Sequence, residues 1–170
     1  VEAMIDYAFR KNGCGRVGYG SIVAGGKNST CLHYRANNEA LKDGDLLLID
    51  AGGEYDYYTS DITRTFPVGR TFSDAQAKLY DLVLKSQEEG IAMAKPGATL
   101  VGIHERTCEV LVDGLLSLGL LKGTRTDLIK SNAHRRFYPH NTSHWLGMDV
   151  HDLGLYRIDG EPRKLEPGMA

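Results

Sequence analysis

Apolar residues recur along the chain with two different spacings, which predicts a mixture of helices and strands. Helical spacing opens the chain and returns after Ser73 and Thr99, two residues of the kind that cap helix N-termini. The two later helices are expected to end at Pro96-Gly97 and near Gly119. The opening stripe consists of Met4, Ile5, Ala8 and Phe9.

Between these helices, continuous or β-rich runs predict strands. Leu46 to Asp50 is an apolar run that ends in a carboxylate and favours a buried strand. Tyr57 to Val68 is rich in Tyr, Thr, Ile and Phe and is predicted to be its antiparallel partner. A further strand is expected over Val17 to Ala24. Residues 122–136 are polar and basic and are predicted to form an exposed loop.

The two predicted strands would form a hairpin, and each of them carries one aspartate. With a turn near Tyr55-Asp56, Asp50 would lie directly opposite Asp61, and opposed Cβ atoms are about 5 Å apart. Two such carboxylates repel, and burying them costs several kcal/mol unless a cation or a shared proton compensates. Hard carboxylate oxygens suit a divalent metal, or two bridging metals. The alternative is that one Asp is a turn residue that points to water.

Histidines near the end of the chain favour the metal interpretation. His140, His144 and His151 lie within twelve residues, beside the apolar Trp145 and Leu146. A lone histidine in such a place is more often a core residue. Three of them, in a chain that also carries the Asp pair, predict a site with mixed nitrogen and oxygen ligands.

Composition excludes several other classes of function. The chain has 20 basic and 22 acidic residues, a net charge of −2, and no long run of like charge, which gives no support to nucleic-acid or polybasic membrane binding. No apolar run approaches the ~20 residues of a membrane span. The three cysteines, Cys14, Cys31 and Cys108, are widely spaced, so neither a disulfide framework nor a cysteine zinc site is expected, and a reducing, cytoplasmic setting is predicted.

Several longer motifs make the sequence recognisable, and the likeness covers nearly the whole chain. At these motifs the sequence resembles the pita-bread metallopeptidases, and most closely their Xaa-Pro aminopeptidase branch. The motifs are Ser21-Ile-Val-Ala-Gly-Gly, Cys31-Leu-His33-Tyr, Leu48-Ile-Asp50-Ala-Gly-Gly-Glu-Tyr, Ser60-Asp61-Ile-Thr-Arg-Thr-Phe-Pro67 and Ser143-His144-Trp-Leu-Gly-Met-Asp-Val-His151-Asp.

The resemblance implies an α+β pita-bread fold, in which helices cover a curved, mostly antiparallel sheet. Residues 1–170 would be part of the catalytic domain, without the family's amino-terminal domain and without the end of the catalytic domain. The family has five metal ligands, and its two glutamates would come after Ala170, so Glu166 is not expected to be one of them. The 170-residue chain alone is therefore expected to be inactive.

The resemblance also implies an activity and a set of site residues. The whole protein would be a metal-dependent aminopeptidase that hydrolyses the bond between an N-terminal residue and proline, with two divalent metal ions, Mn²⁺, as cofactors. Its substrates would be peptides with proline at the second position, and self-association into a homo-oligomer is expected. The implied metal ligands are Asp50, Asp61 and His144, the catalytic residue is His151, and the substrate-binding residues are His33 and His140.

Three alternatives stay open at this point. Prolidase, an Xaa-Pro dipeptidase, shares most of these sequence motifs, although it more often has Gly-His at the position of Ser143-His144. A metal-independent hydrolase on the same fold would be expected to lack the ligand positions. A non-catalytic binding module on this fold would also have lost those residues, and such modules act in chromatin, where a basic chain would be expected.

Overall fold

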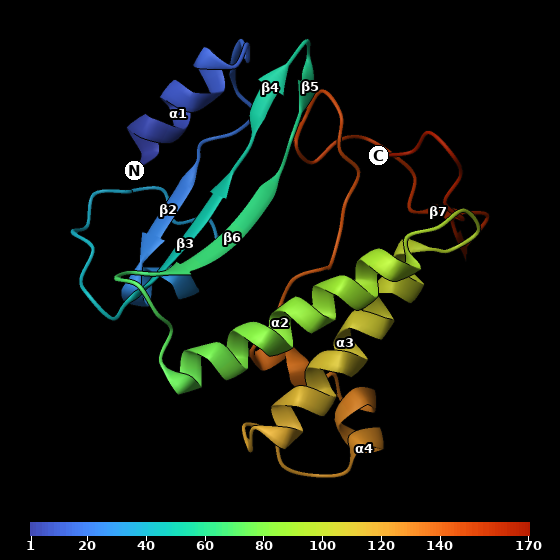
Figure 1. Ribbon diagram of the computed structural model, residues 1–170. Coiled ribbons are helices and arrows are strands. Elements are labelled where there is room, and N and C mark those ends of the chain that lie inside the picture. The colour runs from blue at the N-terminus through green and yellow to red at the C-terminus, as the bar shows by residue number, and fades with distance from the viewer. The chain divides into compact units, whose positions relative to one another are not determined.

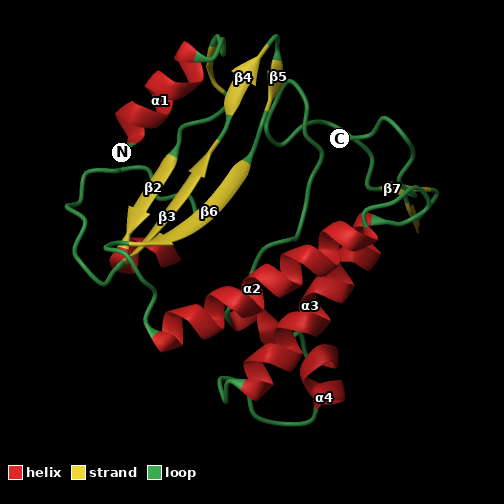
Figure 2. Ribbon diagram, in the orientation of Figure 1, coloured by secondary structure: helices red, strands yellow, loops and turns green.

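A computed structural model describes residues 1–170 and divides the chain into two compact units (Figures 1 and 2). The first, which we call the sheet unit, comprises Val1–Ser73, Trp145–Leu153 and Ala170. The second, which we call the helical unit, comprises Asp74–His144 and Gly154–Met169. None of the helices is both long and apolar enough to cross a membrane.

Two three-stranded antiparallel sheets form the sheet unit, with strand orders β2-β3-β6 and β1-β4-β5. The opening helix and the strand at residues 46–50 are confirmed, whereas the strand expected over 17–24 is interrupted and the one expected over 57–68 is divided in two. The elements are α1 (Glu2–Lys11), β1 (Arg16–Val17), β2 (Ile22–Gly25), η1 (Gly26–Thr30), β3 (Leu46–Ala51), β4 (Gly53–Tyr55), β5 (Tyr58–Thr59) and β6 (Ile62–Pro67).

The hairpin turn lies one residue later than predicted, and this corrects the register. Asp56 and Tyr57 both have positive φ, 51° and 65°, and they form a two-residue turn that pairs Tyr55 with Tyr58. Asp50 consequently pairs with Thr63, so the predicted direct opposition of Asp50 and Asp61 is wrong. The error changes the register by two positions, and it therefore leaves both aspartates on the same face of the hairpin.

A glycine allows the two chains of the hairpin to approach closely where one ladder ends and the next begins. The Ser60 N–H donates to the Gly53 carbonyl at 3.0 Å, between the β3–β6 and β4–β5 ladders. A Cβ atom at Gly52 would lie 1.6 Å from the Ser60 carbonyl oxygen, so only glycine fits at this position. This close approach lies two residues after Asp50 and one residue before Asp61.

The segment Trp145–Leu153 is attached to the outer end of the hairpin. The Thr59 N–H donates to the Gly147 carbonyl at 2.8 Å, and the Thr59 hydroxyl donates to the same oxygen at 2.9 Å. The Tyr58 hydroxyl donates to the Leu146 carbonyl at 3.1 Å. Residues far apart in the sequence are thereby joined within one unit.

In the helical unit, two long helices lie side by side (Figure 1). As predicted, Thr99 caps the second of them, because its hydroxyl accepts from the Gly102 N–H at 3.1 Å. A Cβ atom at Gly114 would lie 2.0 Å from Leu82 Cδ1, so glycine allows the two helices to approach closely. The elements are α2 (Asp74–Met93), α3 (Leu100–Ser117), α4 (Arg125–Lys130), η2 (Ala133–Arg136), β7 (Arg157–Ile158) and β8 (Glu161–Pro162).

The loop predicted over residues 122–136 is instead a short helix and a 3₁₀ turn. The Thr124 hydroxyl accepts from the Asp127 N–H at 3.2 Å and starts α4. Leu128 and His134 are 9% and 5% exposed, so this polar segment buries one side chain from each short element. The polar composition concealed the two buried positions, because the charged residues of α4 and η2 stay exposed.

Candidate functional site

A tyrosine holds the two predicted metal-binding carboxylates together. The Tyr19 hydroxyl donates to Asp50 Oδ1 and also to Asp61 Oδ1, at 2.9 Å for the latter. Asp50 is carried by β3, Asp61 immediately precedes β6, and Tyr19 lies between β1 and β2. The sheet unit therefore brings Asp50 and Asp61 to one point, although they are not direct cross-strand partners.

The electrostatics of this cluster favour a cation. Burial raises the pKa of Tyr19 well above its ordinary value, and the Asp50 and Asp61 carboxylates raise it further, so the hydroxyl remains protonated. The Tyr19 hydroxyl bonds two partly buried carboxylates that lie close together, and two like charges so placed repel unless a cation or a shared proton compensates. Hard oxygen ligands in such an arrangement fit a divalent metal ion.

We expect Tyr19→Phe to destabilise the metal-free protein more than the metal-loaded protein. Hydrogen bonds to charged groups contribute about 1.5–3 kcal/mol, and phenylalanine removes the donor that Asp50 and Asp61 share. A bound cation would offset the negative charge of both carboxylates, so the lost hydroxyl would matter less. Urea unfolding of wild type and variant, with chelator and with Mn²⁺, measures both differences. An equal loss of stability in the two conditions would contradict this role for Tyr19.

Two of the expected histidines belong to the sheet unit. His33 is exposed and has a left-handed φ of 57°, in a turn closed by the Tyr34 N–H and the Cys31 carbonyl at 3.2 Å. His151 is exposed on the Trp145–Leu153 segment, next to Asp152, whose N–H donates to the Trp145 carbonyl at 3.0 Å. Both imidazoles are accessible to solvent.

The other two expected histidines belong to the helical unit. His140 is exposed and packs edge-on against the Tyr138 ring, with ring centroids 4.4 Å apart, and its Nδ1 lies 2.8 Å from the Asn141 carbonyl oxygen. His144 is partly buried at the last position of this unit's first segment. Thus Tyr19 joins Asp50 to Asp61, while His140 and His144 belong to a different unit from the acidic pair.

Sequence reasoning missed Tyr19 as part of the site. It stands in the glycine-rich stretch Val17 to Gly20, where no periodicity or spacing marks it as a partner of the carboxylates. Only the strand pairing reveals the relation, since β2 pairs Ile22 with Asp50 and so brings the residues before it toward that carboxylate.

A second group of titratable side chains, absent from the predicted site, lies within the helical unit. It consists of His104 and Cys108 on α3 and His134 on η2. Burial lowers the pKa of both histidines, and the Arg135 charge lowers each further. Burial raises the pKa of the Cys108 thiol. At neutral pH both imidazoles and the thiol are therefore uncharged.

These pKa shifts predict that the local stability of α3 falls in mild acid. A histidine whose pKa is lowered by folding binds protons more readily when unfolded, so its contribution to stability is lost as the pH falls below about 6.5. Hydrogen exchange of α3 amides at about pH 7.5 and about pH 5.5, corrected for intrinsic rates, should show weaker protection in acid. His134→Asn should reduce this dependence. Equal protection at both pH values would contradict the prediction.

Neighbouring carboxylates such as Asp50 and Asp61 are suitable ligands for divalent metal ions, which many hydrolases use in catalysis. The pattern of metallopeptidase family M24 matches residues 1–170, and the chain belongs to this family. The Xaa-Pro aminopeptidase of Escherichia coli (strain K12) is 46% identical over 169 residues, covering 99% of this chain and 38% of that protein. Intermediate cleaving peptidase 55, mitochondrial, of Arabidopsis thaliana is 39% identical over 169 residues, covering 99% of this chain and 32% of that protein.

Solved structures give the same family. The Pseudomonas aeruginosa aminopeptidase PepP is similar with a TM-score of 0.97 and 52% identity, over 99% of this chain and 38% of that one. Zinc-substituted Escherichia coli aminopeptidase P in complex with product gives a TM-score of 0.95 and 46% identity, with the same coverage. These similarities confirm the predicted pita-bread fold class. The chain spans 38% or less of the length of these relatives.

Proposed function

We propose that the full-length protein is a metal-dependent aminopeptidase that hydrolyses the bond between an N-terminal residue and a following proline. The observation that carries this proposal is the Asp50–Tyr19–Asp61 cluster, found in a chain that is 46% identical to an Xaa-Pro aminopeptidase. Its substrates would be peptides with proline at the second position. Residues 1–170 would form part of its pita-bread catalytic domain.

The proposed metal ligands within this chain are Asp50, Asp61 and His144, and the proposed cofactors are two divalent ions, Mn²⁺. Bound ions of this kind supply Lewis-acid chemistry, since they make water nucleophilic near neutral pH and polarise the scissile carbonyl. Asp50 would chelate one ion, Asp61 would bridge the two, and His144 would bind the other. Tyr19 would hold the two carboxylates in place through their Oδ1 atoms.

Three exposed histidines are proposed to act on the substrate. His151 would donate a hydrogen bond to the scissile carbonyl oxygen as negative charge develops there, which stabilises the tetrahedral intermediate. His33 and His140 would orient the proline residue and the substrate residues C-terminal to it. Their exposure makes each ring accessible to a peptide, whereas a structural histidine is more often buried.

The proposal is tested by comparing substrates of the full-length, Mn²⁺-loaded protein. We expect hydrolysis of a tripeptide with proline at its second position, much slower hydrolysis when alanine replaces proline, and slow hydrolysis of the Xaa-Pro dipeptide. A preference for the dipeptide would indicate a prolidase instead. Absence of turnover of every proline peptide, with metal bound, would favour a non-catalytic binding module.

The cellular compartment and the oligomeric state of the protein are also proposals. All three cysteines, Cys14, Cys31 and Cys108, are free thiols, which is typical of a reducing compartment, and we place the protein in the cytoplasm. We also propose that the full-length protein forms a homo-oligomer. Light scattering of the full-length protein measures the number of copies.

A further inference from the structure

We infer that His104, Cys108 and His134 form a second metal site, suited to Zn²⁺ or a similar borderline-soft cation, within the helical unit. One ring nitrogen of each histidine and the Cys108 sulfur all lie within 4.8 Å of one another. This site shares no ligand with the proposed Asp50, Asp61 and His144 centre. It also differs in chemistry, because sulfur replaces carboxylate oxygen.

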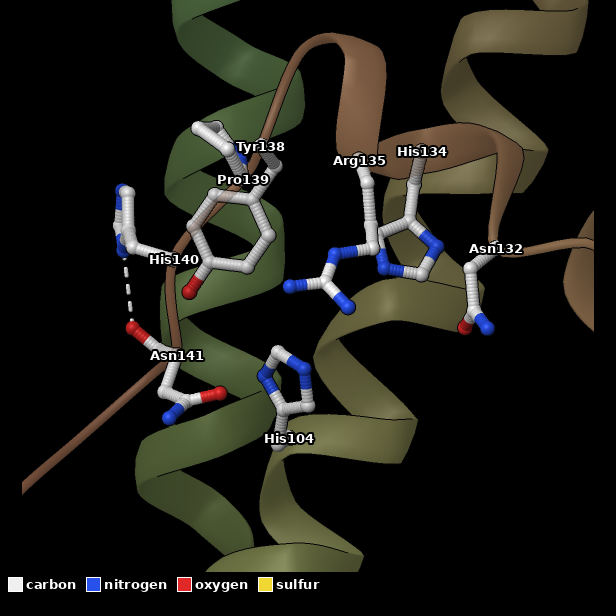
Figure 3. A pocket seen from close by; sticks show the side chains of 8 residues that line it. All are labelled: His104, Asn132, His134, Arg135, Tyr138, Pro139, His140 and Asn141. Carbon is white, nitrogen blue, oxygen red and sulfur yellow. Dashed lines mark hydrogen bonds between the residues drawn. The ribbon is translucent and has the colours of Figure 1, made fainter.

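Local structure explains why the three side chains meet. His104 and Cys108 are four residues apart on α3, so they lie on one face of the helix, with Cys108 Sγ 3.5 Å from His104 Nε2. Asn132 has a left-handed φ of 52° and connects α4 to η2, which carries His134. Figure 3 shows the rings of His104 and His134 approaching each other from α3 and η2, with centroids 6.4 Å apart.

An unsatisfied buried atom points to a missing ligand. His134 is 5% exposed, and its Nδ1 is buried with no hydrogen-bond partner. Leaving such an atom unpaired costs about 1–3 kcal/mol, so it needs an explanation. The same residue, together with His104 and Arg135 among others, lines a cavity of about 60 Å³, which has room for water as a further ligand.

A neighbouring hydrogen bond prepares His104 to bind a cation. Thr142 Oγ1 lies 2.9 Å from His104 Nδ1, and it also accepts the Tyr138 hydroxyl at 3.0 Å. In the proposed site Nδ1–H donates to Thr142, which leaves Nε2, now 3.5 Å from the Cys108 sulfur, as the ligand nitrogen once the ring turns toward the cation. Histidine ligands typically have such a partner on the second ring nitrogen.

The donor set and its protonation fit Zn²⁺. Two imidazoles and a thiolate are ligands that zinc accepts, with an open fourth position for water. Tetrahedral bonding places ligand atoms about 3.5 Å apart, so the present maximum of 4.8 Å requires movement of about 1 Å. Both imidazoles are already neutral, and Zn²⁺ would form a bond to sulfur as the S–H bond breaks and its proton passes to bulk water.

Two charged residues near the cluster act in opposite directions, and the effect of Arg135 is the larger. Arg135 raises the local positive potential and Glu105 opposes it, and both act on His104 and Cys108. Arg135 is exposed, so its guanidinium can extend into solvent when a cation binds. The bound cation would join η2 to α3 and so fix the start of the segment that leads to His140 and His144.

Cobalt spectroscopy of the full-length protein tests this site without relying on enzymatic activity. After chelation of all metals, titration with Co²⁺ should produce a near-ultraviolet thiolate-to-cobalt charge-transfer band, which excess Zn²⁺ should remove. A centre made of Asp50, Asp61 and His144 contains no sulfur and cannot give this band. Absence of the band in the wild-type protein overturns the proposal, and no variant needs to fold for that result.

Variants then assign the band to these residues. Cys108→Ser should abolish it, and His134→Gln should weaken Co²⁺ binding by at least about tenfold, since even changes outside the ligand shell cost roughly 10–100-fold. The matched control is Cys31→Ser, because Cys31 is an exposed thiol outside the cluster and its loss should leave the band intact. Asp61→Asn should also retain the band. Loss of the band in either control, or its persistence in Cys108→Ser, would overturn the assignment.

Discussion

Asp61→Asn is expected to abolish the proposed metal-dependent peptidase activity of the full-length protein. The amide is nearly isosteric with the carboxylate, but it removes the negative charge with which Asp61 would bridge two cations. Because both ions depend on this ligand, the fall in kcat/KM should exceed the ~10²–10³-fold loss that removing a single oxyanion donor causes. Bound Mn²⁺, measured by elemental analysis after gel filtration, should fall with the activity.

Asp56→Asn provides a matched control on the same hairpin. Asp56 is exposed, and its left-handed φ of 51° is one that asparagine also adopts, so the turn should be preserved. This variant should keep both its metal and its activity. If Asp61→Asn behaved in the same way, Asp61 would not be a metal ligand and the proposed centre would be wrong.

Local signals allowed much of the helical framework to be predicted. The stripe of Met4, Ile5, Ala8 and Phe9 corresponds to α1, and the hydroxyl of Thr99 caps α3 as expected. These features depend on residues within one or two turns of each other, so the sequence contains the relevant information directly. The pita-bread fold class followed from longer motifs that resemble a known family, rather than from periodicity.

Features that depend on long-range pairing were harder to predict. Moving the turn by one residue changed the partner of Asp50 from Asp61 to Thr63, although the even shift kept both aspartates on one face. Tyr19 could not be found, because its role requires the pairing of β2 with β3. Polar composition similarly concealed α4, η2 and the burial of His134.

Cysteine spacing alone did not reveal the proposed His104, Cys108 and His134 metal site, because that site also depends on long-range contacts. The wide spacing of the three cysteines argues against a cysteine metal site, yet His104 and Cys108 stand one helical turn apart on α3. That spacing was a usable signal for two ligands on one helix face. The third member, His134, lies on a different element, and only the structure brings it to the pair.

His151→Ala in the full-length enzyme is expected to lower kcat by ~10²–10³-fold, the cost of removing one hydrogen-bond donor to a developing oxyanion. His151 is exposed on the Trp145–Leu153 segment, which Thr59 attaches to the hairpin through the Gly147 carbonyl. Because the donor would act only in the transition state, KM and Mn²⁺ content should change little. Steady-state kinetics and elemental analysis of the same preparation measure all three quantities.

The comparison with Met148→Ala separates a chemical role for His151 from a structural one. Met148 is 67% exposed on the same segment and contributes no donor, so its loss should leave kcat near the wild-type value. His151→Gln, which retains an N–H donor, should recover part of the lost rate. A parallel loss of metal and activity in His151→Ala would make His151 a metal ligand. An equal loss in Met148→Ala would instead show that the rate depends on the packing of the segment, since both truncations would then act through the same attachment to β5.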